Sequence, residues 1–159
     1  MRDFGGRTRL GRLDAGGKLV YTAFLVFVMG GMVSAALLHH DGMGLDAQTA
    51  ASWWVGDEAA MRYPKSYRQI LELTHFHLFT EPVCFLVIAH LYHLGGQALA
   101  LRVGVTAITL LCMAGQVALP WLVAYVAPGF AVLMLPIHAG LLLGLLWMSV
   151  SAIVEMWRG

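Results

Sequence analysis

Residues 19–38 read LVYTAFLVFVMGGMVSAALL, a run of twenty positions without a charged side chain. An α-helix of about 20 residues is long enough to cross the hydrocarbon core of a bilayer, which is roughly 30 Å thick. The run is longer than the apolar region of a cleavable signal peptide, and it ends in His39 and His40 rather than at a small-residue cleavage site. We therefore expect it to remain in the protein as a membrane-spanning helix.

The composition of the whole chain points to the same class of protein. Of its 159 residues, 59% are hydrophobic and 12% are charged, whereas soluble domains carry about 45–50% apolar and about 25% charged residues. This balance excludes a soluble globular enzyme and a disordered tail. The net charge of +1 also argues against nucleic-acid binding, because a protein that reads a duplex presents a basic face. We expect an all-α integral membrane protein with one domain, residues 1–159.

Three further apolar stretches complete a predicted bundle of four transmembrane helices surrounded by lipid. The predicted spans cover approximately 19–39, 69–95, 102–126 and 130–155. The segment 41–68 is then the one longer loop outside the bilayer. Asp46 is placed to cap a short helix there, and Trp53 and Trp54 suit the headgroup layer. We therefore expect a short interfacial helix in this loop.

The distribution of Lys and Arg predicts the orientation of the bundle. Seven of these ten residues lie at the ends that four spans place on one side of the membrane, whereas Arg62, Lys65 and Arg68 lie on the other side. Because positively charged loops stay in the cytoplasm, we expect both termini to be cytoplasmic and the loop 41–68 to face outward. In a bacterium this is a multi-pass inner-membrane protein with a periplasmic loop.

All seven histidines lie within a predicted span or at its end. An ionisable residue within a span costs about 2.5–3.5 kcal/mol on the insertion scale, so such residues usually face a cavity or a partner. The second span carries most of them, and the fourth carries one more. The candidate cofactor-binding residues are His75, His77, His90, His93 and His138, and the accompanying carboxylates are Glu72 and Glu81.

The depths of these residues favour a haem site near the outer face. At about 1.5 Å per residue, His75, His77 and His138 lie at a similar depth, and two imidazoles on facing helices can bind the iron of a b-type haem. His138 is one predicted ligand, and either His77 or His75 is the other. At most one of these two faces the bundle interior, because they point to nearly opposite sides of the helix.

Carboxylates and small residues support the same site. Glu72 lies three residues before His75, and Glu81 lies four residues after His77, so each carboxylate can orient its histidine. Small residues in the first span, including Gly30, Gly31 and Ser34, could leave room for a flat ring. Gly140 and Gly144 form a small-xxx-small motif, which predicts close helix packing on the face that carries His138.

The same residues leave alternatives open. His90 and His93 lie near the inner surface with no second histidine at their level, so a second haem would need Met148 or another chain. Both histidines also fit simple hydrogen-bonding roles near a helix end. A quinone site would use Glu72 and His75 with two aromatic neighbours, Phe76 and Phe79. A carboxylate-bridged di-metal site is less well matched, because only one Glu-x-x-His segment is present.

The segment YPKSYRQILELTHFHLFTEPV, residues 63–83, resembles a sequence in small four-span bacterial inner-membrane proteins that occur beside respiratory or cytochrome components. The overall plan also resembles, more loosely, the cytochrome b561-like and formate-dehydrogenase-gamma-like membrane cytochromes. The chain differs from these cytochromes because it lacks a second histidine at the inner level. The resemblance implies electron transfer through one haem rather than through a two-haem path across the membrane.

These observations predict a membrane-anchor or electron-transfer subunit of a respiratory-type complex, with one haem b near its outer face. Such a chain would work as part of an oxidoreductase complex rather than as an enzyme alone. Its expected partners are other membrane subunits and a periplasmic redox protein that meets the loop 41–68. The first alternative is a cofactor-free structural or assembly subunit of a larger complex, and the second is a quinone-site subunit.

Overall fold

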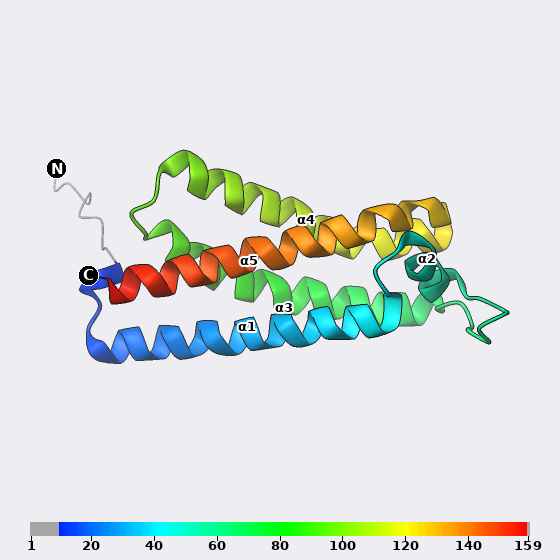
Figure 1. The fold of residues 1–159 in the computed structure, drawn as a ribbon, viewed down its shortest axis with the longest axis horizontal. Coiled ribbons are helices and arrows are strands. Elements are labelled where there is room, and N and C mark those ends of the chain that lie inside the picture. The colour runs from blue at the N-terminus through cyan, green and yellow to red at the C-terminus, as the bar shows by residue number, and fades with distance from the viewer. Residues whose placement is uncertain (1–9, 159) are drawn as a thin grey trace.

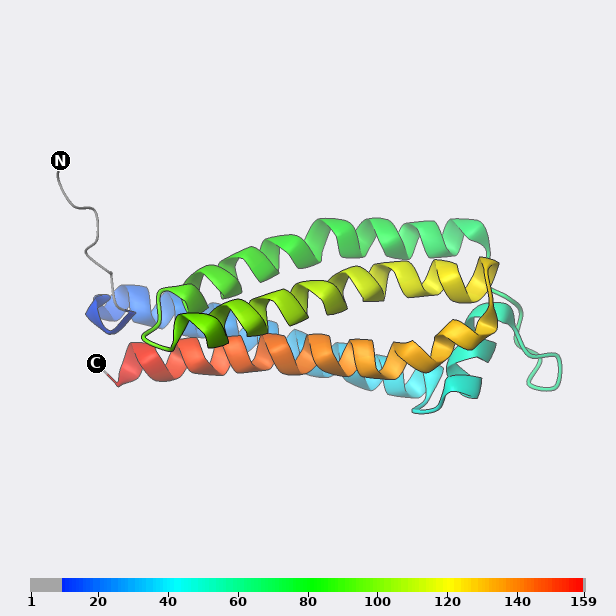
Figure 2. The same cartoon turned by 90° about the horizontal axis from the view of Figure 1, so that it is seen from above.

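The computed structural model describes residues 10–158, and all of its regular elements are helical. Four long helices lie side by side along one axis (Figures 1 and 2). Each is long and apolar enough to cross a membrane, which confirms the predicted four-helix transmembrane architecture. The long helices are α1 (Ala15–Met43), α3 (Tyr67–His93), α4 (Leu99–Tyr125) and α5 (Met134–Trp157).

Three short helices close the two ends of the bundle. The 3-10 helix η1 (Leu10–Arg12) precedes α1, and a second 3-10 helix, η2 (Pro128–Leu133), leads directly into α5. The predicted interfacial helix is α2 (Ala47–Val55). Figure 1 shows α2 and η2 at one end of the bundle, with both described chain ends and the α3–α4 turn at the other. An even number of spans produces this arrangement, and the side that faces the cytoplasm stays a prediction.

Side-chain caps fix where several helices begin. Asp46 accepts hydrogen bonds from the backbone N–H groups of Gln48 and Thr49, as the sequence predicts for the start of α2. The hydroxyl of Thr49 also donates to this carboxylate, and mainly for that reason the pKa of Asp46 lies below its ordinary value. Ser66 and Gln69 form a reciprocal capping box at the start of α3. Asp14 caps α1, which begins four residues before the predicted span.

Helix α5 lies at the centre of the packing, because it contacts α1, α3 and α4 as well as the short helices η1, η2 and α2. Two separate groups of buried apolar side chains result. The termini-end core contains Leu10, Leu25, Ile88, Ala89, Leu91, Tyr92, Met148, Ala152 and Met156. The loop-end core contains Ala50, Trp54, Ile70, Leu119, Val123, Ala131 and Met134.

Close approach of α4 and α5 depends on two glycines of α5. A Cβ atom added to Gly140 would lie 2.7 Å from the sulfur of Cys112, and one added to Gly144 would overlap the side chain of Thr109. This contact confirms the packing role predicted for the small-xxx-small motif. The glycines are about 200–240° around the helix from His138 at 100° per residue, so the motif does not share a face with that histidine, contrary to the prediction.

Helix α1 is peripheral to the other three long helices. Leu25 is its one fully buried residue. Near its start, the indole N–H of Trp157 donates to the hydroxyl of Thr22. Gly30 and Gly31 are exposed, and a Cβ atom added to either would meet nothing within 4 Å. The two glycines therefore do not pack against another helix, and the expectation that the small residues leave room for a ring stays a prediction.

The glycine contact predicts a difference between two otherwise similar substitutions. Gly104→Ala on α4 adds a methyl group in open space, so we expect unchanged or higher stability, by up to about 1 kcal/mol from helix propensity. Gly144→Ala gains the same propensity but pushes Thr109 away, and we expect a net loss of about 1–3 kcal/mol. Unfolding of both variants in detergent micelles would test this. Equal changes in stability would show that α4 and α5 can move apart to accommodate the added methyl group at little cost.

Candidate functional site

The two apolar cores are separated by a layer of polar side chains contributed by all four long helices. We call this set the polar layer: His39 of α1, His77 and Glu81 of α3, Gln116 of α4, and His138 of α5. Within the layer, His39 lies against His138, and Glu81 lies against His77 and Gln116. The layer is nearer to the α2 end of the bundle than to the chain ends, because His39 and Gln116 lie near the ends of α1 and α4 and His138 lies near the start of α5.

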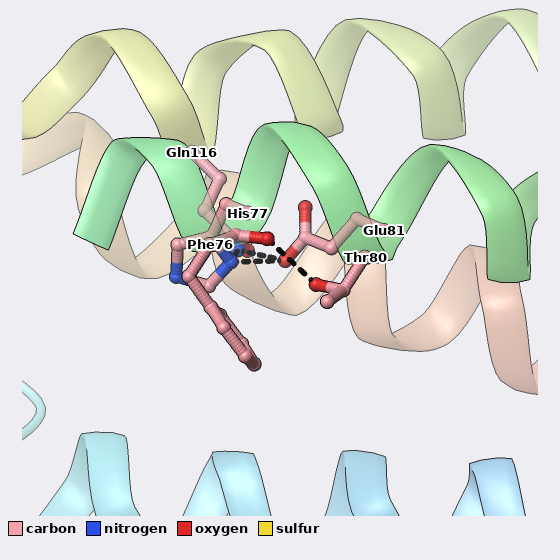
Figure 3. Close-up of polar contacts among 5 residues, drawn as sticks. All are labelled: Phe76, His77, Thr80, Glu81 and Gln116. Atoms are coloured by element: carbon pink, nitrogen blue, oxygen red, sulfur yellow. Dashed lines mark hydrogen bonds and ion pairs between the residues drawn. The ribbon is translucent and has the colours of Figure 1, made fainter. Parts of the chain in front are cut away.

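The centre of the layer is a compact hydrogen-bonded group of His77, Glu81 and Gln116 (Figure 3). Nδ1 of His77 lies 2.6 Å from Oε1 of Glu81, one helical turn further along α3. The side-chain amide of Gln116 donates to the same oxygen across the α3–α4 interface at 2.5 Å. The other oxygen, Oε2, is buried and finds no hydrogen-bond partner among residues 10–158. A single oxygen atom of Glu81 therefore has nitrogen neighbours from two helices, Nδ1 of His77 and the donating amide of Gln116.

A second histidine faces the layer from α5. Nδ1 of His138 lies 2.6 Å from the backbone carbonyl oxygen of Met134, to which it donates. The ring of His39 lies beside it, with 4.4 Å between ring centroids and a tilt of 42°. Within residues 10–158, the Nε2 atoms of His77 and His138 make no hydrogen bond. Each of these histidines thus has one nitrogen engaged by an acceptor and the other free.

The structure distinguishes His77 from His75, a choice that the sequence leaves open. His77 is partly buried in the layer, whereas His75 is exposed and lies against Phe79 of its own helix, with 5.8 Å between ring centroids. Glu72 lies 2.8 Å from the exposed guanidinium of Arg68 and does not orient a buried histidine. The residues proposed for a quinone site, including Phe76, are all exposed.

The remaining candidates on α3 are not brought together. His90 is exposed, while Met148, its suggested partner for a second haem, is completely buried in the termini-end core. Nε2 of His93 is 2.9 Å from the hydroxyl of Thr106 on α4, and Arg102 donates to the backbone carbonyl of His93. His93 therefore makes an interhelical hydrogen bond, one of the two roles considered for it from the sequence.

Gln116 is the residue that sequence reasoning missed. The search for ionisable groups in spans passes over a neutral amide, although an amide in a hydrocarbon environment also needs partners. Its position inside the otherwise apolar span 102–126 is the signal that could have identified it. The partner itself could not be inferred, because the facing residues of α3 and α4 depend on how the two helices pack.

No group of three or more His, Cys, Asp or Glu side chains within residues 10–158 is arranged to hold a bare metal ion. Cys84 and Cys112 are both free thiols. Cys112 packs against Gly140, in agreement with the packing role expected for it from the sequence. The side chains of the layer that can bind or exchange a proton are three imidazoles, those of His39, His77 and His138, and one carboxylate, that of Glu81.

Two glutamates of α3 provide a matched test of this description. Glu72 and Glu81 each pair with a residue four positions earlier. The side chains of Arg68 and Glu72 are 87% and 62% exposed, whereas those of His77 and Glu81 are 23% and 24% exposed. We expect Glu81→Ala to reduce the free energy of unfolding by about 1–3 kcal/mol, because it leaves two partly buried donors unpaired. Glu72→Ala should cost only about 0.3–0.5 kcal/mol. Denaturation in micelles would measure the free energy of unfolding of both variants. Equal decreases would contradict the conclusion that the polar layer is shielded from solvent.

Comparison with known proteins identifies the class of domain. Residues 44–159 match the model of the Aq_1264_TM family, described as a transmembrane helical domain. The matched region contains α2 to α5, and with them every member of the polar layer except His39. No curated protein and no solved structure shows significant similarity to the chain. The match covers more than half of the chain, which is therefore a multi-pass membrane protein that belongs to the Aq_1264_TM transmembrane helical domain family.

Proposed function

We propose that this protein is an electron-transfer subunit of a membrane oxidoreductase complex and that it holds one b-type haem in the polar layer. The observation that carries the proposal is the arrangement of His77 and His138. Both face the bundle interior, and both have Nδ1 engaged by an acceptor while Nε2 is free. Histidines that bind a metal typically donate their other ring nitrogen to a carboxylate or a backbone carbonyl, and these two residues show one example of each.

The surroundings of the two histidines are compatible with a bound macrocycle. The layer lies between two apolar cores instead of forming part of either. The side chains of His77 and Glu81 are about one-quarter exposed, so apolar packing does not fully enclose them. Figure 3 shows the ring of Phe76 extending from α3 towards α1 beside this group. His77 and His138 would hold the iron, and the Glu81 carboxylate and the Met134 carbonyl would orient their rings.

A bound haem would supply one-electron chemistry, and this chain would supply the setting for it. If His77 and His138 both hold the iron, the site would suit electron transfer rather than substrate binding at the iron. The helices around the layer provide an apolar environment of low dielectric, which favours one buried electron carrier. Further membrane subunits and a redox protein on the α2 side are the partners that such a carrier needs. The cation–π contacts of Arg62 and Lys65 with Trp53 hold the intervening loop in a defined shape for docking.

A cofactor-free structural or assembly subunit is the second candidate. The observation that favours it is the amount of unpartnered apolar surface, because only 6% of the residues in the apolar windows of α1 and α3 are buried. Lipid covers such surfaces in any membrane protein, but neighbouring subunits can cover them equally well. In this case the histidines would serve only to join α3 to α4, His77 through Glu81 and Gln116, and His93 through Thr106.

The haem proposal predicts a specific pattern of spectra. The purified chain should give a b-type reduced-minus-oxidised spectrum, and a pyridine haemochrome assay should find about one haem per chain. His77→Ala and His138→Ala should each lose most of the haem, because each removes an axial ligand. His75→Ala is the matched control, since this histidine lies two residues away and faces outward, and it should retain the haem.

Two results would contradict the haem proposal. The first is a folded but colourless chain. The second is equal haem loss in the His75 and His77 variants, which would show that the interior position of His77 does not matter. A His138→Ala protein that loses its partner subunits without any spectral change would favour the structural alternative.

A further inference from the structure

Oε1 of Glu81 has two nitrogen neighbours that compete for its lone pairs. Nδ1 of His77 is 2.6 Å away and Nε2 of Gln116 is 2.5 Å away, while these two nitrogens lie 3.1 Å from each other. The amide nitrogen of Gln116 acts only as a hydrogen-bond donor, and an ionised carboxylate acts only as an acceptor. Both nitrogens are therefore best satisfied as donors to the same oxygen.

This geometry selects one tautomer of His77. A neutral imidazole carries its proton on one ring nitrogen and presents a lone pair on the other. If the proton is on Nδ1, it is donated to Glu81 in a short, charge-assisted hydrogen bond. If the proton is on Nε2, the Nδ1 lone pair faces the carboxylate oxygen at 2.6 Å, which is repulsive. The contact thus favours the Nδ1–H tautomer and leaves the lone pair on Nε2.

Gln116 is the residue that keeps the carboxylate in this position. Glu81 has a flexible side chain, its Oε2 has no partner among residues 10–158, and Pro82 follows it directly. The hydrogen bond with His77 joins two residues of the same helix, whereas the bond from Gln116 comes from α4. Because α4 is fixed against α5 through Gly140 and Gly144, Gln116 ties Glu81 to a rigid part of the bundle.

We infer that Gln116 is a positioning residue, which acts through Glu81 to hold His77 in the Nδ1–H tautomer with Nε2 free for coordination. The purpose of this arrangement rests on the proposed haem site, but the tautomer is a property of the chain and does not require haem. Neutral Gln116 is suited to this role, because it donates to the carboxylate without cancelling its charge. A lysine or arginine there would form an ion pair with Glu81 and weaken its hold on His77.

The tautomer can be measured directly by nitrogen NMR. The full-length chain, labelled with ¹⁵N-histidine and produced in a haem-deficient host, would be studied in micelles at about pH 8, above the ordinary histidine pKa of about 6.5. His77→Gln would assign the signal. We expect His77 of the wild-type protein to carry its proton on Nδ1. Gln116→Met, similar in length but without a donor, should lower the ratio of the Nδ1–H to the Nε2–H form about fivefold.

Thr106→Val provides a matched control on the same helix. It removes the partner of His93, so it should change the His93 signals and leave those of His77 unchanged. If Gln116→Met does not fold, Gln116→Asn serves instead, because its amide is one methylene too short to reach Glu81. A wild-type His77 protonated on Nε2, or a Gln116 variant with an unchanged tautomer ratio, would overturn the inference.

The outcome is separable from that of the haem proposal. A colourless wild-type protein with His77 in the Nδ1–H form and a shifted ratio in Gln116→Met would refute haem binding and support the positioning role. A haem-containing wild-type protein whose haem-free form shows the opposite tautomer would support haem binding and refute the role of Gln116.

Discussion

A carboxylate inside a membrane-spanning helix must obtain its hydrogen bonds from the protein, because lipid supplies no donors. Glu81 obtains its hydrogen bonds from His77 and Gln116. The contact among these three side chains links α3 to α4 within the polar layer. The rest of the polar layer depends on this link. It turns His77 towards the interior, where His138 faces it from α5, and it sends His75 to the opposite surface.

The sequence predicts the architecture well because hydropathy acts over whole spans. Four runs of about 20 apolar residues allow few other folds in a bilayer, and Asp46 marks the start of α2 through its own side chain. Details that depend on how the helices pack were harder to predict from the sequence. The glycines of α1 look like space for a ring in the sequence, but their role depends on which side of α1 faces α5, and the helix is apolar all round.

The site was predictable only in part for the same physical reason. Hydropathy and spacing locate His75, His77 and His138 at one level, but a choice between the two histidines of α3 requires the orientation of that helix. Gln116 was harder still, because its importance comes entirely from a contact with Glu81, a residue 35 positions earlier on another helix. Its amide carries no charge, and nothing in α4 alone shows that it lies opposite a carboxylate.

Most residues of the polar layer lie in the part of the chain that matches the family model, and α1 lies outside this part. The matched region begins at residue 44, one position after α1 ends, and it contains His77, Glu81, Gln116 and His138. These four residues come from α3, α4 and α5, three helices that pack on one another. Helix α1 adds His39 against His138 but contributes one buried residue to the cores. Four of the five residues of the polar layer thus come from the three packed helices, and α1 adds the fifth from a more peripheral position.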